Sequence, residues 1–165
     1  MLEACVSCVK EISVLKRKII TYSTIFIIVV LVVARSVFLF TPRRLDNALQ
    51  LPPQDIKLVS ITASTATGAD FHTYNTYRIS EIKALTYLFS TVQVKFSGWS
   101  NGRISIQSGT TLYEIYFNYI KTDLRLYITT DGKVYYNGRI LSITPNQVNT
   151  FIGQLDKLRS AWTSS

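Results

Sequence analysis

The stretch that decides the fold is Leu124-Arg125-Leu126-Tyr127-Ile128-Thr129-Thr130-Asp131-Gly132-Lys133-Val134-Tyr135-Tyr136-Asn137-Gly138-Arg139-Ile140-Leu141-Ser142-Ile143. Its first residues alternate between leucine or isoleucine and more polar side chains, which is the two-residue period of a strand with one buried face. Asp131-Gly132 and Asn137-Gly138 favour two-residue hairpin turns, because such turns need positive φ. The stretch therefore predicts three antiparallel strands joined by two hairpins.

The sequence upstream of this stretch predicts further short strands and one loop. Residues rich in β-branched or aromatic side chains predict strands over 56–62, 94–96, 103–107 and 111–120. Small and polar residues dominate 63–74, where we expect a loop.

Two helices complete the predicted domain. Ser80 is the expected N-cap of the first, whose apolar residues recur at helical spacing up to Val92. Thr144, Pro145 and Gln147 have the spacing of an N-cap, a first helical residue and a capping-box partner for the second. The order of elements predicts an α+β domain: an antiparallel sheet of about five to six strands with both helices on one face.

An apolar segment, residues 19–40, precedes this domain. Its 22 residues at about 1.5 Å each span about 33 Å, enough for a hydrocarbon core of about 30 Å. The basic block Lys16-Arg17-Lys18 abuts its N-terminal edge, which favours a cytoplasmic N-terminus. The chain is thus divided into a basic cytoplasmic tail (1–18), a transmembrane signal anchor (19–40), a proline-containing linker (41–54) and an extracytoplasmic domain (55–165).

A cleaved signal peptide is the alternative to an anchor. The basic and apolar regions fit both, and Ala34-Arg35-Ser36 has the small residues of a cleavage site. The apolar run resumes over Val37-Phe38-Leu39-Phe40, which favours retention as an anchor. Either reading places the domain outside the cytoplasm, and the anchor predicts a single-pass protein of the cell membrane.

This organisation resembles that of small membrane-anchored or secreted sheet-and-helix proteins of Gram-positive bacteria. The most similar parts are the hairpin over residues 124–136 and the helix that begins at Thr144-Pro145. The resemblance implies the same fold for residues 55–160 and implies no catalytic residue.

Residues suited to catalysis, metal binding or cofactor binding are sparse and scattered. Both cysteines, Cys5 and Cys8, lie in the tail, where a zinc site would need two further ligands. His72 is the only histidine, and Glu81 and Glu114 are the only glutamates of the domain. No phosphate-binding glycine motif occurs. We therefore expect no catalytic site, no metal site and no cofactor, and an envelope hydrolase is the least favoured alternative.

The positive charge does not indicate a nucleic-acid partner. The net charge is +8, of which +5 lies within residues 1–45, on either side of the apolar segment. The domain carries little of the charge and is expected outside the cell, so a nucleic-acid platform is disfavoured.

Tyrosines suggest where the domain makes contacts. If strand alternation holds, Tyr116, Arg125, Tyr127, Lys133 and Tyr135 lie on the sheet face away from the core. Tyrosine offers a flat apolar ring with a polar tip, which suits binding of a protein, peptide or sugar; it is also common on solvated strands. We expect a non-catalytic interaction module at the cell envelope, with the lipid bilayer and an envelope protein or cell-wall polymer as partners. A secreted inhibitor or immunity-type protein is the alternative.

Overall fold

The computed structural model describes residues 20–37, 40–51, 56–65, 72–120 and 122–164. The chain forms two units, Met1–Phe40 and Thr41–Ser165. The first contains an exposed apolar helix, Ile20–Val37, and in the described part of the chain this is the one helix long and apolar enough to cross a membrane; a signal sequence has the same properties. Lys16-Arg17-Lys18, Cys5 and Cys8 lie outside the described residues.

Within that helix, two hydroxyl groups bond to the helix itself. Thr24 and Ser36 donate to the carbonyl oxygens of Ile20 and Val32, each at 2.9 Å. Both polar side chains are thereby satisfied without water, as a hydrocarbon environment requires.

The second unit is built on one antiparallel sheet. The strand order is β1-β4-β8-β7-β6-β5-β2-β3-β9. The strands are β1 (Arg43–Arg44), β2 (Ile56–Thr65), β3 (His72–Thr76), β4 (Gln93–Trp99), β5 (Thr111–Tyr119), β6 (Asp123–Thr129), β7 (Lys133–Tyr136), β8 (Arg139–Ile143) and β9 (Thr163–Ser164).

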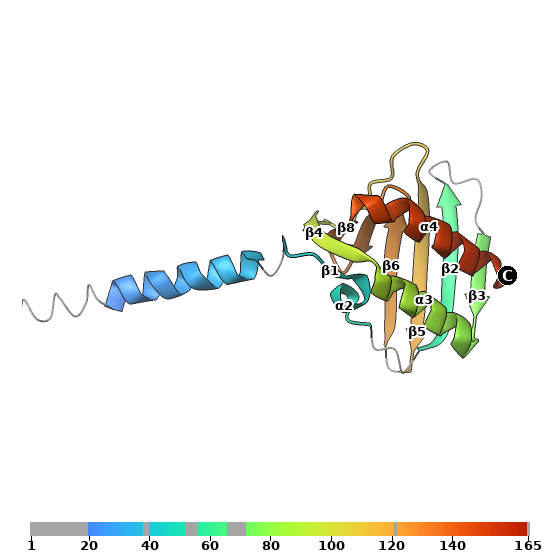
Figure 1. Cartoon of the computed structure of the whole chain (residues 1–165), viewed down its shortest axis with the longest axis horizontal. Coiled ribbons are helices and arrows are strands. Elements are labelled where there is room, and N and C mark those ends of the chain that lie inside the picture. The colour runs from blue at the N-terminus through green and yellow to red at the C-terminus, as the bar shows by residue number, and fades with distance from the viewer. Residues whose placement is uncertain (1–19, 38–39, 52–55, 66–71, 121, 165) are drawn as a thin grey trace, which may run out of the picture. The chain divides into compact units, whose positions relative to one another are not determined.

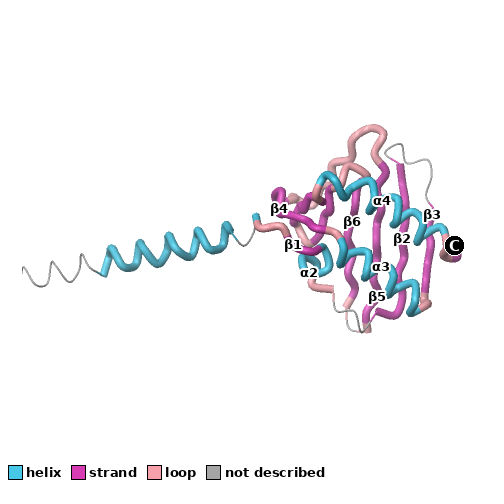
Figure 2. Tube along the Cα trace, viewed as in Figure 1, coloured by secondary structure: helices cyan, strands magenta, loops and turns pink. Residues whose placement is uncertain are grey.

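Two long helices cover one face of this sheet. Helices α3 (Ile79–Thr91) and α4 (Pro145–Ser160) run side by side across it, and the short helix α2 (Leu45–Leu49) lies near β1 (Figures 1 and 2). Phe89 of α3 packs against Phe117 of β5 and Phe151 of α4, with ring centroids about 6 Å apart in both pairs. These three rings join both helices to the centre of the sheet, and the α+β class and the single antiparallel sheet are confirmed.

The two hairpins of the deciding stretch form where the sequence predicts them. Tyr127 pairs with Tyr135 across β6 and β7, and Tyr136 pairs with Arg139 across β7 and β8. Gly132 has φ +83° and Gly138 φ +72°. Asn137 also has a positive φ, +47°, so Asn137-Gly138 is the two-residue turn that its sequence favours. The β6–β7 turn is longer, because its last strand pair is Ile128–Val134, and only Gly132 uses the left-handed backbone there.

The sheet is larger than the predicted five to six strands. The described residues form nine strands, of which β1 and β9 contain two residues each. The end of β2, 63–65, and the start of β3, 72–74, fall in the predicted loop 63–74, and 66–71 lie outside the described residues. Hydroxyl pairs such as Thr62–Thr73, 3.0 Å apart, satisfy polar side chains that suggested a loop. Residues 103–107 are not a strand.

The predicted N-cap Ser80 is wrong, whereas Thr144 and Pro145 hold the predicted N-cap and first helical positions without the predicted side-chain bonds. α3 begins after Arg78, and the Thr76 hydroxyl accepts from the Arg78 backbone N–H at 3.0 Å. Thr144 does precede α4 but makes no side-chain cap; its hydroxyl donates to Gln93 O at 3.2 Å. Gln147 likewise accepts from the Gln93 backbone N–H at 2.9 Å. These side chains connect α4 to β4.

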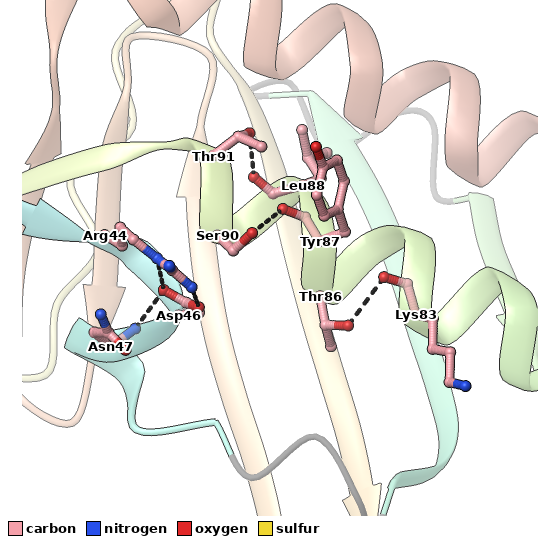
Figure 3. A network of polar contacts seen from close by, with 9 residues as sticks. All are labelled: Arg44, Asp46, Asn47, Lys83, Thr86, Tyr87, Leu88, Ser90 and Thr91. Carbon is pink, nitrogen blue, oxygen red and sulfur yellow. Dashed lines mark hydrogen bonds and ion pairs between the residues drawn. The ribbon is translucent and has the colours of Figure 1, made fainter.

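Part of the predicted linker 41–54 belongs to the folded unit. Arg43–Arg44 pairs with β4, and Leu45 and Leu49 are fully buried. Asp46 accepts from Arg44 at 2.5 Å and from the Asn47 backbone N–H at 2.7 Å (Figure 3). The hydrogen bond from Arg44 lowers the pKa of Asp46. Two buried leucines hold this segment on the domain, and 52–55 lie outside the described residues. The predicted boundary at residue 55 is therefore too late.

Candidate interaction surface

The sheet face opposite α3 and α4 is called the open face below. Among the described residues no helix covers it (Figure 2). On β5, Tyr113, Ile115 and Phe117 are buried on the helix side. Because side chains alternate along a strand, Glu114 and Tyr116 belong to the open face.

Strand register brings the predicted contact residues onto this face. Tyr116 is opposite Arg125 in the β5–β6 pair, and Tyr127 is opposite both Glu114 and Tyr135. Lys133 is two residues from Tyr135, so it lies on the same face. All five residues named from the sequence are thus neighbours on the open face.

Arg125 is the centre of this group. Its Nε lies 3.1 Å from Oε1 of Glu114, and its guanidinium carbon lies 5.7 Å from the centroid of the Tyr116 ring. A hydrogen bond with Tyr127 and the charge of Glu114 raise the pKa of Arg125 above its usual value. The guanidinium is therefore permanently charged and held by three neighbours, while its side chain is 57% exposed.

Tyr135 and Lys133 differ from the other three in exposure. Tyr135 is only 5% exposed, and its hydroxyl donates to Ser105 O at 3.2 Å. Residues around Ser105 therefore cover it, so Tyr135 supports the open face without presenting its ring. Lys133 lies 3.1 Å from Asp131, whose hydrogen bond raises the pKa of Lys133.

The open face extends onto strands that the sequence did not assign to it. Ser60 donates to Asn75 at 2.5 Å, and Thr62 pairs with Thr73. In register, Ser60 is opposite Tyr116 and Thr62 is opposite Glu114. The alternation of Val59, Ile61 and Ala63 with these hydroxyls was the available signal. These residues add a polar margin to the aromatic and charged centre.

A cavity of about 480 Å³ adjoins the open face at the end where β5 meets β6. Arg125, Asp123 and Asn137 line it together with Tyr119, which is 7% exposed. Among the described residues the Tyr119 hydroxyl has no hydrogen-bond partner. Burial is the main cause that raises the pKa of Tyr119 to about 12, and the electrostatic interaction with Tyr136 adds to it. The cavity offers mainly neutral hydroxyl and amide groups, with Asp123 and Arg125 as its two charged side chains.

Another cluster of titratable side chains joins α4 to the sheet. Asp156 accepts from the Tyr113 hydroxyl at 3.1 Å and from Arg159 Nε at 2.7 Å. The Arg159 guanidinium lies over the Tyr74 ring, 5.2 Å from its centroid. Each of these groups contacts Arg159 or Asp156, which fits a structural role. His72 is exposed at the start of β3.

Metal ligands do not gather in the described part of the chain: no group of three or more His, Cys, Asp or Glu side chains occurs there. Comparison with protein-family models, with curated proteins and with solved structures found no match.

Proposed function

We propose that this chain is a single-pass membrane protein that displays a non-catalytic binding domain on the outer side of the membrane. The N-terminal helix is the tether, and the open face is the contact surface. The observation that carries the proposal is Arg125, an exposed cation held by Glu114 and Tyr127 over the ring of Tyr116.

Stability does not account for this arrangement. Exposed ion pairs contribute about 0–1 kcal/mol, so a fixed surface arginine adds little to folding. The fixed arginine contributes more to binding affinity. A flexible long side chain would have to be ordered on association, which costs about 0.5–1.5 kcal/mol. Arginine and tyrosine are also enriched at protein interfaces. An arginine ordered beforehand between two tyrosines therefore supports a binding role.

The open face favours recognition over catalysis. Its acidic groups are engaged: Glu114 with Arg125 at 3.1 Å, and Asp123 with the Asn118 amide at 2.9 Å. Carboxylates that are already bonded to neighbouring side chains are poorly placed to exchange a proton with a substrate, because a general acid or base must reach the reacting group itself. The proposed partner is an envelope protein or a cell-wall polymer that presents hydrogen-bonding groups to a flat aromatic surface.

Photo-crosslinking from position 127 tests the proposal and separates the two partner classes. A benzophenone side chain replaces Tyr127 in the full chain within its native membrane. Muramidase lowers the mass of an adduct with a wall polymer and leaves an adduct with a protein partner unchanged. A matched crosslinker at Tyr87, an exposed tyrosine on α3, is the control.

The specificity of the open face is tested by truncation. Arg125→Ala/Tyr127→Ala should abolish an adduct captured from a third position, Thr62. Lys83→Ala/Tyr87→Ala removes one base and one tyrosine from the exposed side of α3 and should leave the adduct intact. Equal adduct yields in both double variants would contradict the open-face proposal.

A further inference from the structure

Two segments on the β4 side of the sheet carry basic residues and no acidic ones; Asp46 of the neighbouring helix α2 is paired with Arg44. Residues 93–113 and 132–155 contain no Asp or Glu. These ranges include β4, the segment after it, and the β7–β8 hairpin. Lys95, Arg103 and Arg139 are exposed within them. With Trp99, these three residues define what is called the β4 surface below. It follows the edge of β4: by strand alternation Lys95 lies on the open-face side of that edge, in the row of Lys133, and Trp99 and Arg139 lie on the helix side.

Trp99 is the exposed aromatic residue of this surface. It is 63% exposed at the end of β4, whereas Trp162, the second tryptophan of the chain, is 6% exposed. The Trp99 ring packs edge-on against Phe96 with centroids 5.2 Å apart, and the Arg139 guanidinium lies 5.9 Å from its centroid. A large apolar ring is thus held at the surface beside a cation.

The β4 strand is also where the chain joins the domain. Arg43 pairs with Val94 in antiparallel orientation, so the chain before Arg43 runs toward the Trp99 end of β4 (Figure 1). Trp99 is five residues from Val94, less than about 17 Å along a strand. Six Cα–Cα steps, across residues 38–42, lead from Val37, the last residue described before the gap at 38–39, to Arg43. They reach at most about 20 Å when fully extended.

We propose that the β4 surface rests on the headgroup region of a bilayer that contains anionic lipids. The inference rests on the membrane tether of the proposed function. If the apolar helix spans a bilayer, the short connection keeps β4 close to the membrane surface. Tryptophan prefers the interface between headgroups and acyl chains, and basic side chains are attracted to anionic headgroups. Because neither range contains Asp or Glu, neither carries a carboxylate that anionic headgroups would repel.

Docking of this surface would orient the domain. The β4 edge would contact lipid, and β5 and β6, which carry Tyr116 and Arg125, lie further along the sheet. The open face would then stand at an angle to the membrane and stay accessible to a partner. The short connection restricts the positions available to the domain, which raises the effective concentration of the β4 surface at the lipid.

The two tryptophans provide the test. Full-length chain is reconstituted in phosphatidylcholine vesicles with or without about 30% phosphatidylglycerol. Lipids brominated near the headgroup quench tryptophan that reaches the interface. We expect strong quenching of the native protein in anionic vesicles and little in neutral ones. In Trp99→Phe, which leaves only the buried Trp162, we expect quenching to fall at least threefold. Equal quenching of both proteins would overturn the proposal.

Charge variants test the lipid preference. Lys95→Gln/Arg139→Gln should lower quenching in anionic vesicles by about half or more, because each base near an anionic surface adds attraction. Lys57→Gln/Lys83→Gln removes the same charge from exposed positions on β2 and α3 and should not lower it. Equal effects of the two pairs would overturn the role of the β4 surface.

Flotation of the vesicles after an alkaline wash reports the tether separately. A chain that fails to float contradicts the membrane anchor, and hence the proposed function. A chain that floats while Trp99 is not quenched contradicts the β4 surface alone.

Discussion

Tyr113 and Tyr119 lie on the same face of β5 and differ in what their hydroxyl groups contact. Tyr113 donates to Asp156 at 3.1 Å, whereas the Tyr119 hydroxyl has no partner among the described residues. Tyr113→Phe should lower the free energy of unfolding by about 1–3 kcal/mol, since it removes a bond to a charged group. Tyr119→Phe should leave it unchanged or raise it, because it removes an unsatisfied buried group.

Urea titration of the full chain in mild detergent, followed by near-ultraviolet circular dichroism, measures both variants. The native protein is the reference, and the two substitutions remove the same atom. A loss of stability in Tyr119→Phe equal to that in Tyr113→Phe would show that the Tyr119 hydroxyl has a partner.

The same two phenols make stability depend on alkaline pH. Burial is the largest cause that raises the pKa of each to about 12, and Asp156 contributes for Tyr113. An unfolded tyrosine has a pKa of about 10. Because the folded pKa is higher, the stabilisation is fully present below about pH 10 and is lost as the pH rises toward about 12. Urea midpoints at about pH 9 and about pH 11 should differ less in the double phenylalanine variant than in the native protein.

Strand alternation predicted the orientation of Tyr116, Arg125 and Tyr127, because it depends only on the two-residue period. It could not predict the burial of Tyr135. That burial depends on a hydrogen bond to Ser105, thirty residues earlier in a segment without regular structure. The local sequence therefore predicts on which face of the sheet a side chain lies, whereas its exposure on that face depends on tertiary contacts.

At the scale of elements, the β6–β7 hairpin and α4 meet at Gly132. A Cβ at Gly132 would lie 2.7 Å from Cγ2 of Val148, and its φ is +83°. Gly132→Ala should therefore cost about 2–4 kcal/mol, from backbone strain and the collision with a stiff valine. Gly102 has φ +84° and no atom within 4 Å of the same position, so Gly102→Ala should cost about 1 kcal/mol.

Denaturant midpoints of the two glycine variants isolate the contact with α4. Their difference reports the collision alone, because both replace a glycine at nearly the same φ. Gly132→Ala/Val148→Ala should recover part of the loss that is due to the collision. Equal costs for the two single variants would show that α4 moves away without penalty.

The caps show how element ends depend on neighbours. The spacing of Thr144 and Gln147 correctly predicted that a helix begins near Pro145, yet both side chains bond to Gln93. Gln93 begins β4, more than fifty residues earlier. A sequence pattern identifies residues that satisfy free backbone groups at a helix start; it does not identify which backbone groups they satisfy when a strand end lies equally close.

For the molecule as a whole, the sequence predicted the apolar segment, the antiparallel sheet and the two covering helices. It missed β1, α2, β3 and β9, which are two to five residues long. Elements this short have too few residues to show a period, and they form because the completed domain buries Leu45 and Leu49. Because β1 and α2 belong to the domain, only a short connection leads to the apolar helix. The proposed contact of the β4 surface with lipid depends on this short connection.

The membrane topology can be measured with the cysteines of the chain itself. Both of them, Cys5 and Cys8, precede the apolar helix. Lys16-Arg17-Lys18 favours an N-terminus that stays in the cytoplasm. A membrane-impermeant maleimide should therefore leave the protein of intact cells unlabelled and should label it once the membrane is permeabilised. Cys5→Ala/Cys8→Ala/Tyr87→Cys moves the thiol to an exposed position on α3 and should be labelled in intact cells.

Three other labelling patterns would each contradict this topology differently. Labelling of the native chain in intact cells would place its N-terminus outside. No labelling after permeabilisation, with a shorter chain recovered from the medium, would mean that the segment is cleaved and the domain released. Failure to label Tyr87→Cys in intact cells would place the domain inside, where the basic segment before the helix and the domain after it would share one compartment. The apolar helix would then not cross the membrane, and the β4 surface would lose the short tether on which its contact with lipid depends.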